Sequence, residues 1–245
     1  MTPDIRALYA AADATWPPAE RIDAGPWMLR NGAGGGKRVS AATAESAWRA
    51  DDLAAAEAAM RLLGQAPLFM IREGEADLDL ALEARGYAMI DPVDIWWCPL
   101  AKLTDLPIPR VTAFALWEPL AVMRDIWQAG GIDDARIAVM ERAAHPKTSI
   151  FGRIDDKPAG AAFCAIHAGI ALVHAIEIAS AHRRKGLAAW MIRRAAFWAA
   201  ENGANSMAVL CKKANDAAIG LYTSLDMQVV GQYHYRIQPN SGDLE

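Results

Sequence analysis

The stretch that most constrains this chain is residues 176–188, where an apolar, strand-like run meets a basic turn and then helical spacing. The first N–H groups of a helix have no partner within it and lie at the positive end of its dipole, so they favour anions. Gly186 and Ala188 leave room for a ligand to approach the backbone. Positive charge comes from three consecutive residues, Arg183, Arg184 and Lys185. The stretch therefore predicts a site for a phosphate or pyrophosphate.

Size and charge limit the classes of protein that fit. A chain of 245 residues with 53% hydrophobic residues can build one large domain or two small ones around a real core. Proteins that coat nucleic acids carry a basic face, whereas this chain has a net charge of −4. One basic cluster in an acidic chain predicts a small anionic ligand and no nucleic-acid partner.

The cysteines and the apolar runs predict a cytoplasmic protein. No basic segment followed by an apolar core and a cleavage site is present near Met1, so we expect no signal peptide. The long apolar run 159–176 is interrupted by His167 and Gly169, which favours a hairpin of two buried strands over a membrane helix. Three widely spaced cysteines in apolar contexts read as buried, reduced thiols: Cys98, Cys164 and Cys211.

Hydrophobic periodicity predicts an α+β fold. Helical spacing occurs over 3–15 (with Thr2 as its cap), 51–63, 77–85, 120–128, 133–143, 184–201 and 215–225. Strand-like runs occur over 27–30, 38–42, 67–71, 88–98, 111–116, 148–154, 159–166, 170–179, 206–211 and 228–237. A stretch punctuated by Pro99, Pro107 and Pro109 has neither pattern and reads as a linker.

The glycine-rich segment 31–37 invites comparison with a phosphate-binding P-loop. That motif needs a glycine five residues before its Gly-Lys pair and a serine or threonine after it, but Asn31 and Arg38 stand there. We interpret the segment as a hairpin connection.

Two motifs together resemble the GNAT family of acyl-coenzyme A N-acyltransferases. The family's phosphate motif is similar to Arg183-Arg-Lys-Gly186-Leu-Ala188, which directly follows a strand. The helix Asn215-Asp-Ala-Ala-Ile-Gly-Leu-Tyr222 resembles the family's second motif, and Tyr233-His-Tyr-Arg236 fits its last strand. Two motifs at the family's separation are more specific than either alone, and the resemblance covers about residues 110–238.

One pair of residues departs from the family pattern. Where the family usually has Gly-Phe after the second helix, this chain has Asp226-Met227. An aspartate can adopt the left-handed conformation that glycine offers, and a methionine can fill the pocket of the aromatic ring. We therefore expect the fold to survive.

The first half resembles a degenerate GNAT-like repeat. Its helix and strand around Arg85-Gly-Tyr87 mirror the segment that ends at Met227, but nothing in it matches the phosphate motif. The resemblance implies two GNAT-like domains, each a central, mostly antiparallel twisted sheet flanked by helices. The predicted boundaries are residues 1–105 for the degenerate domain and 106–245 for the catalytic domain.

By resemblance, the cosubstrate is acetyl-coenzyme A (acetyl-CoA). Backbone groups at Ile178 and Ala179 would pair with its pantetheine arm, and the amides from Arg184 to Ala188 would hold its pyrophosphate. Asn215 would bond the cosubstrate or cap its own helix. The predicted cosubstrate site thus comprises Ile178, Ala179, Arg183, Arg184, Lys185, Gly186, Leu187, Ala188 and Asn215.

Acetyl transfer to an amine needs a neutral amine, a polarised thioester and a protonated leaving thiolate. Tyr222 matches the family's general acid, although a tyrosine there can also serve packing alone. Glu177, a charged residue in an apolar strand, is the candidate base, with His174 or a water chain as alternatives. A core role suits His174 better. No metal and no covalent enzyme intermediate are implied.

The acceptor cannot be read from the sequence beyond a small-molecule or peptide amine, because loops rather than the cosubstrate motif set it in this superfamily. The alternative is a cosubstrate-binding sensor or interaction module without catalysis. An aminoacyl-transferring relative would need a basic RNA-binding face, which the chain lacks. The oligomeric state stays open, a homodimer included. Candidate acceptor-pocket aromatics are Trp117, Trp127, Tyr233 and His234.

Overall fold

A computed structural model describes residues 2–239. Contacts divide the chain into two compact units, each assembled from separate segments. The first unit comprises the chain up to Pro17 together with Ile95–Cys211 and Asn215–Val230. The second comprises Pro18–Asp94, Lys212–Ala214 and the chain from Gly231 onward.

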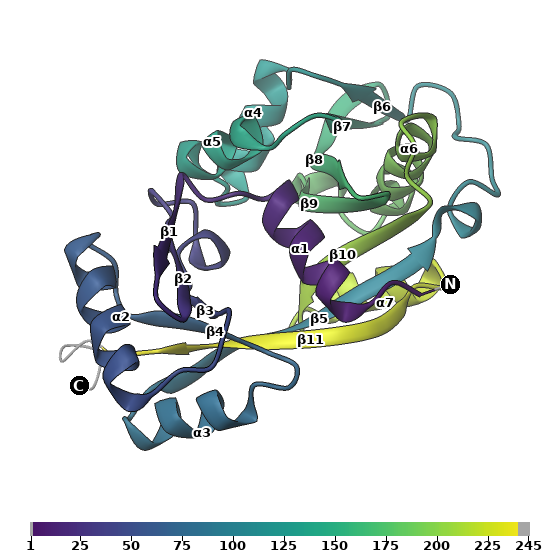
Figure 1. The fold of residues 1–245 in the computed structure, drawn as a ribbon. Coiled ribbons are helices and arrows are strands. Elements are labelled where there is room, and N and C mark those ends of the chain that lie inside the picture. Colours follow the sequence, from purple (N-terminus) through teal and green to yellow (C-terminus); the bar gives the residue numbers. More distant parts are fainter. Residues whose placement is uncertain (1, 240–245) are drawn as a thin grey trace. The chain divides into compact units, whose positions relative to one another are not determined.

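The first unit holds most of one sheet. Its strands lie in the order β6-β7-β8-β9-β10-β5-β11, with antiparallel pairing from β6 to β9 and parallel pairing of β9 with β10 (Figure 1). The helices α1 and α4 contact β8 and β9, and α6 contacts β6 to β9. The strands are β5 (Ala88–Pro99), β6 (Ala113–Leu116), β7 (Lys147–Ile154), β8 (Lys157–His167), β9 (Ile170–Ile178), β10 (Ser206–Lys212) and β11 (Gln228–Ile237). The helices are α1 (Ile5–Thr15), α4 (Ala121–Ala129), α5 (Asp134–Arg142), α6 (Leu187–Glu201) and α7 (Asp216–Ser224), with short 3₁₀ turns η2 (Leu100–Lys102) and η3 (Ser180–His182).

The core of this unit forms where α6 packs closely on the sheet. A Cβ atom at Gly152 or Gly160 would lie 2.5 or 2.7 Å from the Met191 sulfur, so the two glycines leave the space that this helix fills. Met191 is 1% exposed, and burying a side chain of its size stabilises the fold by about 1.5–3 kcal/mol. Tight turns join the three long strands, with positive φ at Asp155 and Asp156 and again at Ala168 and Gly169. The hairpin predicted near residues 167–169 is thereby confirmed.

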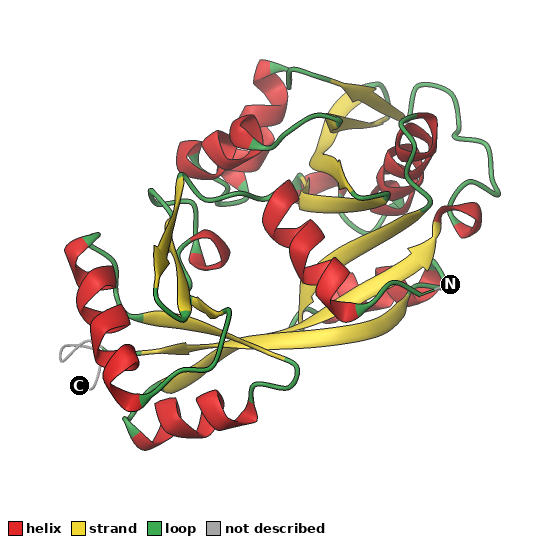
Figure 2. Ribbon diagram, in the orientation of Figure 1, coloured by secondary structure: helices red, strands yellow, loops and turns green. Residues whose placement is uncertain are grey.

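The second unit joins a small three-stranded sheet to a second group of strands. The small sheet has the order β1-β2-β3, and β4 lies beside β11, which is followed by β5 (Figure 2). A buried cluster that includes Trp27, Leu53, Phe69 and Leu82 forms its core. The elements are β1 (Glu20–Ala24), β2 (Trp27–Asn31), η1 (Lys37–Val39), β3 (Thr43–Ala44), α2 (Ala50–Leu62), β4 (Leu68–Arg72) and α3 (Ala76–Ala84).

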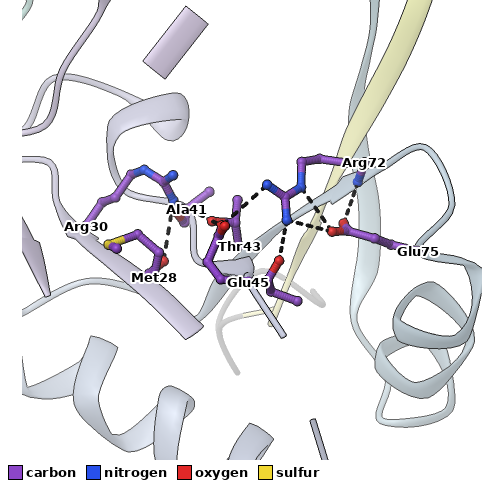
Figure 3. Close-up of polar contacts among 8 residues, drawn as sticks. Met28, Arg30, Ala41, Thr43, Glu45, Arg72 and Glu75 are labelled. Atoms are coloured by element: carbon purple, nitrogen blue, oxygen red, sulfur yellow. Dashed lines mark hydrogen bonds and ion pairs between the residues drawn. The ribbon is translucent and has the colours of Figure 1, made fainter. Parts of the chain in front are cut away.

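Two arginines satisfy polar groups where β3 meets its neighbours in this unit. Figure 3 shows Arg30, which is 6% exposed and donates to the Ala41 carbonyl at 2.9 Å and to the Thr43 hydroxyl at 3.1 Å. Arg72 forms ion pairs with Glu45 at 3.3 Å and Glu75 at 2.8 Å (Figure 3). These partners account for the burial of charge here, since a buried guanidinium without acceptors would be costly.

Two strands contribute residues to both compact units. Residues Ile95–Pro99 of β5 belong to the first unit although this strand ends the first half of the chain. Conversely, β11 from the second half pairs antiparallel with β4 in the second unit, with Tyr233 opposite Arg72 and Ile237 opposite Leu68. Each half of the chain therefore supplies a terminal strand to the unit built mainly from the other half.

Several local predictions were wrong. Residues 38–42 form the 3₁₀ turn η1 and its exit instead of a strand, and the prediction missed β1. The proline-punctuated stretch is not a free linker, since Leu100 and Leu103 are 4% and 0% exposed in the core of the first unit. Asp4, not Thr2, caps α1 through the Arg6 amide.

The predicted α+β class is confirmed, with mixed and mostly antiparallel sheets flanked by helices. Among residues 2–239, no helix combines the length and apolarity needed to cross a bilayer.

We predict that Asp79→Asn destabilises the protein by about 1–3 kcal/mol, because Arg236 and His234 would lose the negative charge of the carboxylate that they share and an amide oxygen is a weaker acceptor. Arg236 is 4% exposed and donates to Asp79 at 2.6 Å, while His234 lies 2.8 Å from the same oxygen. Denaturant titration measures the change, and Asp77→Asn on the exposed face of α3 is the matched control.

The same carboxylate predicts a pH dependence of stability. Burial raises the pKa of Asp79, but hydrogen bonds and charge from Arg236 and His234 outweigh burial and lower it below its ordinary value. The stabilisation is therefore complete above the unfolded-state pKa of about 3.9 and is lost as pH falls through the lower folded-state value. Between pH 7 and pH 3 the wild type should lose more stability than Asp79→Asn, and equal losses would contradict this.

Candidate functional site

The parallel strands β9 and β10 are paired over only part of their length. Their register runs from Ile170 opposite Ser206 to Val173 opposite Val209. Beyond Val173, β9 continues to Ile178 and β10 to Lys212, but within the described residues the two strands are no longer paired there. Exposure changes at the same place, from buried residues up to His174 to half-buried ones from Ala175 onward. The end of β9 thus offers backbone groups to an extended ligand.

A β-bulge in β9 lies at this transition. His174 pairs with Phe163 and Glu177 with Ala161, so three steps along β9 match two along β8. Ala175 has a φ of +51°, and its carbonyl accepts a hydrogen bond of 2.8 Å from the Trp127 indole on α4. The helix therefore holds the carbonyl that the bulge removes from regular pairing.

Because of the bulge, His174 and Glu177 share one face of the sheet. Ile176 and Ile178 pack with Val173 against the core on the α6 side, which leaves His174 and Glu177 toward α1 and α4. His174 is 5% exposed and lies 2.9 Å from the Thr15 hydroxyl of α1. Its ring also stacks on Phe163 at 6.2 Å between centroids. His174 is thus a hydrogen-bonded core histidine, which is the role that the sequence favoured for it.

The loop after β9 leads into α6, whose first turn has no side-chain cap. Gly186 precedes α6 with φ +79° and ψ 0°, the left-handed conformation that favours glycine, and Arg184 has a φ of +63°. No side chain caps the first amides of α6, and no acidic residue lies in its first turn. The amides at this helix start are therefore available to an anion, and Lys185 adds charge although it also lies 3.8 Å from Asp155.

Arg183 uses its side chain differently from its neighbours. Its Nε donates to the Ile178 carbonyl at 2.9 Å, and its Nη2 donates to Glu177 Oε1 at the same distance. Glu177, with a side chain 17% exposed, is thereby fixed at the end of β9. The loop brings Glu177, Ile178, Ala179 and Arg183 together.

Tyr222 lies inside the first unit on α7. It is 6% exposed, and its ring packs against Trp96 of β5 at 5.9 Å between centroids. Burial raises the pKa of the Tyr222 phenol above its ordinary value, and the neighbouring Cys211 adds to the rise. The phenol therefore stays protonated at neutral pH. Asn215 caps the helix, accepting from the Ala218 amide at 3.1 Å.

The substituted pair after α7 behaves as the sequence predicted. Asp226 adopts the left-handed conformation with a φ of +55°, and Met227 is 4% exposed within the core that contains Tyr222. The departure from the family pattern thus leaves the end of α7 intact.

The four predicted acceptor-pocket aromatics do not form one group. Trp127 is buried and holds the Ala175 carbonyl, and Trp117 packs against Phe163 with the Lys147 ammonium 4.6 Å from its ring centre. His234 and Tyr233 belong to the second unit, where they contact Asp79 and Tyr235. Sequence reasoning missed Trp96, because nothing local to β5 points to a contact with α7.

The three cysteines are free and buried, as predicted. Burial raises the pKa of Cys98 to about 11 and also raises that of Cys164. Such thiols carry little thiolate at neutral pH, which suits packing better than nucleophilic chemistry.

Comparison with known proteins shows which family the chain resembles. Residues 114–227 match the acetyltransferase (GNAT) family model. The part of the chain that carries both motifs is therefore similar to GNAT acetyltransferases. A relative described as an uncharacterized N-acetyltransferase, YobR of Bacillus subtilis (strain 168), is 28% identical over 251 residues, which cover 96% of this chain and 99% of the relative.

Two solved structures extend the fold likeness beyond that half. A GCN5-related N-acetyltransferase from Kribbella flavida has a TM-score of 0.71 at 17% identity, covering 97% of this chain and 96% of that protein. A tandem GNAT protein from the clavulanic acid biosynthesis pathway has a TM-score of 0.58 at 12% identity, covering 82% and 76%. At these identities the likeness establishes the fold alone.

We predict that Gly186→Ala weakens binding of coenzyme A about ten-fold, which corresponds to about 1.4 kcal/mol. An alanine at this left-handed position strains the backbone that aims the first amides of α6. Isothermal titration with coenzyme A measures the affinity.

Gly203→Ala provides the matched control at the other end of α6. Gly203 has a φ of +86°, and neither glycine has an atom within 4 Å of an added Cβ. Both variants should lose a similar amount of stability, but only Gly186→Ala should lose affinity. Equal affinities for the two variants would rule out the helix start as the anion site.

Proposed function

We propose that this protein is an N-acetyltransferase that transfers the acetyl group of acetyl-CoA to an amine by direct attack in a ternary complex. The observation that carries the proposal is the end of pairing between β9 and β10 after Val173, beside the uncapped start of α6. Open backbone groups on a strand and an anion-binding helix start suit a long ligand with an amide-containing arm and a pyrophosphate.

The residues present fit acetyl-CoA, which supplies an activated acetyl thioester when bound. Backbone groups of Ile178 and Ala179 would face the pantetheine arm, and amides from Arg184 to Ala188, including those of Gly186 and Leu187, would face the pyrophosphate. Ile178 and Ala179 are half-buried at the end of β9. Asn215 contributes by fixing the start of α7 through the Ala218 amide.

The catalytic roles follow from the two sides of β9. Glu177 lies on the face toward α1 and α4 and would accept the proton of the acceptor amine, since a neutral nitrogen is the nucleophile. Tyr222 lies in the core on the α6 side and would donate its proton to the departing sulfur. The neutral nitrogen forms the C–N bond and the C–S bond breaks as Tyr222 protonates the sulfur; the nitrogen then loses a second proton, which restores the Tyr222 phenol, so one proton is released overall through Glu177. The hydrogen bond of His174 to Thr15 and its stacking on Phe163 favour a structural role for it, so we propose Glu177 as the base.

The acceptor is a small-molecule or peptide amine, and a cytoplasmic location suits the three free, buried thiols. We also propose that the first half is a degenerate GNAT-like repeat. The fold likeness to a tandem GNAT protein supports this, as does the correspondence of α3 followed by β5 with α7 followed by β11.

We predict that Tyr222→Phe lowers kcat at least 100-fold while the KM for acetyl-CoA changes less than three-fold, because the ring stays and the proton donor is lost. Release of free thiol from acetyl-CoA, measured across a panel of amines, aminoglycosides and peptide N-termini, reports turnover. Tyr87→Phe, which removes a 3.0 Å hydrogen bond to Glu57 in the second unit, is the control and should retain turnover.

Two other outcomes would redirect the proposal. Coenzyme A binding without turnover of any amine by the wild type would favour a cosubstrate-binding sensor. Full activity of Tyr222→Phe would leave acetyl transfer standing but remove Tyr222 as its acid.

A further inference from the structure

We infer that Arg183 and Gly130 are positioning residues for Glu177, and that the Arg183 side chain serves this carboxylate instead of binding cosubstrate phosphate. The inference rests on the proposed acetyl transfer with Glu177 as base. It adds two residues to that reaction, one from the phosphate-motif loop and one from the end of α4.

The first observation is the double attachment of one guanidinium. Arg183 Nε and Nη2 are each 2.9 Å from an acceptor, the Ile178 carbonyl and Glu177 Oε1 respectively. The planar guanidinium fixes the relative directions of these two donors, so the backbone contact dictates where the carboxylate contact lies. Arg183 therefore orients the Glu177 side chain relative to the end of β9.

The second observation is the space left by Gly130, which follows α4. A Cβ atom there would lie 2.5 Å from the Cγ, Cδ and Oε2 atoms of Glu177. Gly130 has a φ of −88°, a conformation that any residue adopts, so its backbone does not require glycine. The side chain of Glu177 does require it, because any larger residue would push the carboxylate out of place.

The third observation concerns the same helix. Trp127, one turn before Gly130, donates to the Ala175 carbonyl at 2.8 Å and so holds the bulge that directs Glu177 to this face. The backbone and the carboxylate of this short segment are thus both shaped by the last turn of α4. Because Trp127 and Gly130 both act on this segment, we infer that the fold determines the direction of the Glu177 side chain.

Stability alone does not account for the ion pair. The Arg183 side chain is 58% exposed, and exposed pairs contribute about 0–1 kcal/mol. Orientation matters far more to a proton acceptor, since a base acts only within hydrogen-bond reach of the reacting nitrogen. A positioning role therefore predicts a loss in kcat that is much larger than the loss in stability.

The test is Arg183→Gln, assayed with acetyl-CoA and with S-acetylpantetheine, which lacks the pyrophosphate and the 3′-phosphate. A positioning role predicts that kcat falls about ten-fold with both thioesters, while the KM for acetyl-CoA stays within two-fold. A phosphate ligand would instead raise the KM for acetyl-CoA about ten-fold and leave the reaction of S-acetylpantetheine unchanged, which would overturn the inference.

A double-mutant cycle shows whether Arg183 acts through Glu177. In a Glu177→Gln background, Arg183→Gln should cause no further loss of kcat. Arg183→Lys, which keeps one charge but cannot reach both acceptors in the same geometry, should recover part of the activity. Full additivity of the Arg183 and Glu177 losses would overturn the inference.

Gly130→Ala tests the positioning of Glu177 through its contact with the end of α4, and it leaves the loop that contains Arg183 unchanged. It should lower kcat in the wild-type background and have no effect in a Glu177→Ala background, where the clash is removed. Wild-type turnover that does not depend on Glu177 would overturn this inference and leave acetyl transfer intact. Absence of turnover by the wild type with every amine would overturn both.

Discussion

The hydrogen bond from the Trp127 indole to the Ala175 carbonyl stabilises the β-bulge on which the arrangement of β9 depends. In a regular strand, residues three apart face opposite sides of the sheet, so His174 and Glu177 would be separated. The bulge directs both His174 and Glu177 toward α1 and α4, while Ile176 and Ile178 pack against the core on the α6 side. It also coincides with the point where β9 and β10 cease to pair. One backbone irregularity thus sets the direction of the candidate base and begins the unpaired segment beside the uncapped start of α6.

The local backbone geometry of the candidate site could be predicted because short sequence motifs encode it. The residues from Arg183 to Ala188 specify a left-handed turn and an uncapped helix start, and the structure has both at Gly186. Asp226 and Met227 adopt the conformation and burial expected of them, which follow from the tolerance of aspartate for positive φ and from the apolar side chain of methionine. The contacts of the Arg183 side chain with Ile178 and Glu177 were not predictable, since they depend on the course of the backbone after the bulge.

Predictions that needed long-range contacts failed for a physical reason. The proline-rich stretch has no periodicity, yet Leu100 and Leu103 are buried, because packing overrides local pattern when a core lies nearby. Most helices and strands were predicted within a few residues, since periodicity over many residues is a strong signal. The assignment of β5 and β11 to units could not be read in this way, because strand partners are chosen by the whole fold.

The two strands that contribute to both units limit when each unit can be completed during synthesis. Because β11 pairs with β4, the second unit acquires this partner strand only after residues 228–237 have been synthesised. The first unit waits for the opening residues of the same strand, Gln228–Val230. Neither unit is therefore complete while most of the chain is still emerging from a ribosome. Termination of synthesis before residue 228 would therefore leave both units without their residues of β11, including the unit that contains Glu177 and Tyr222.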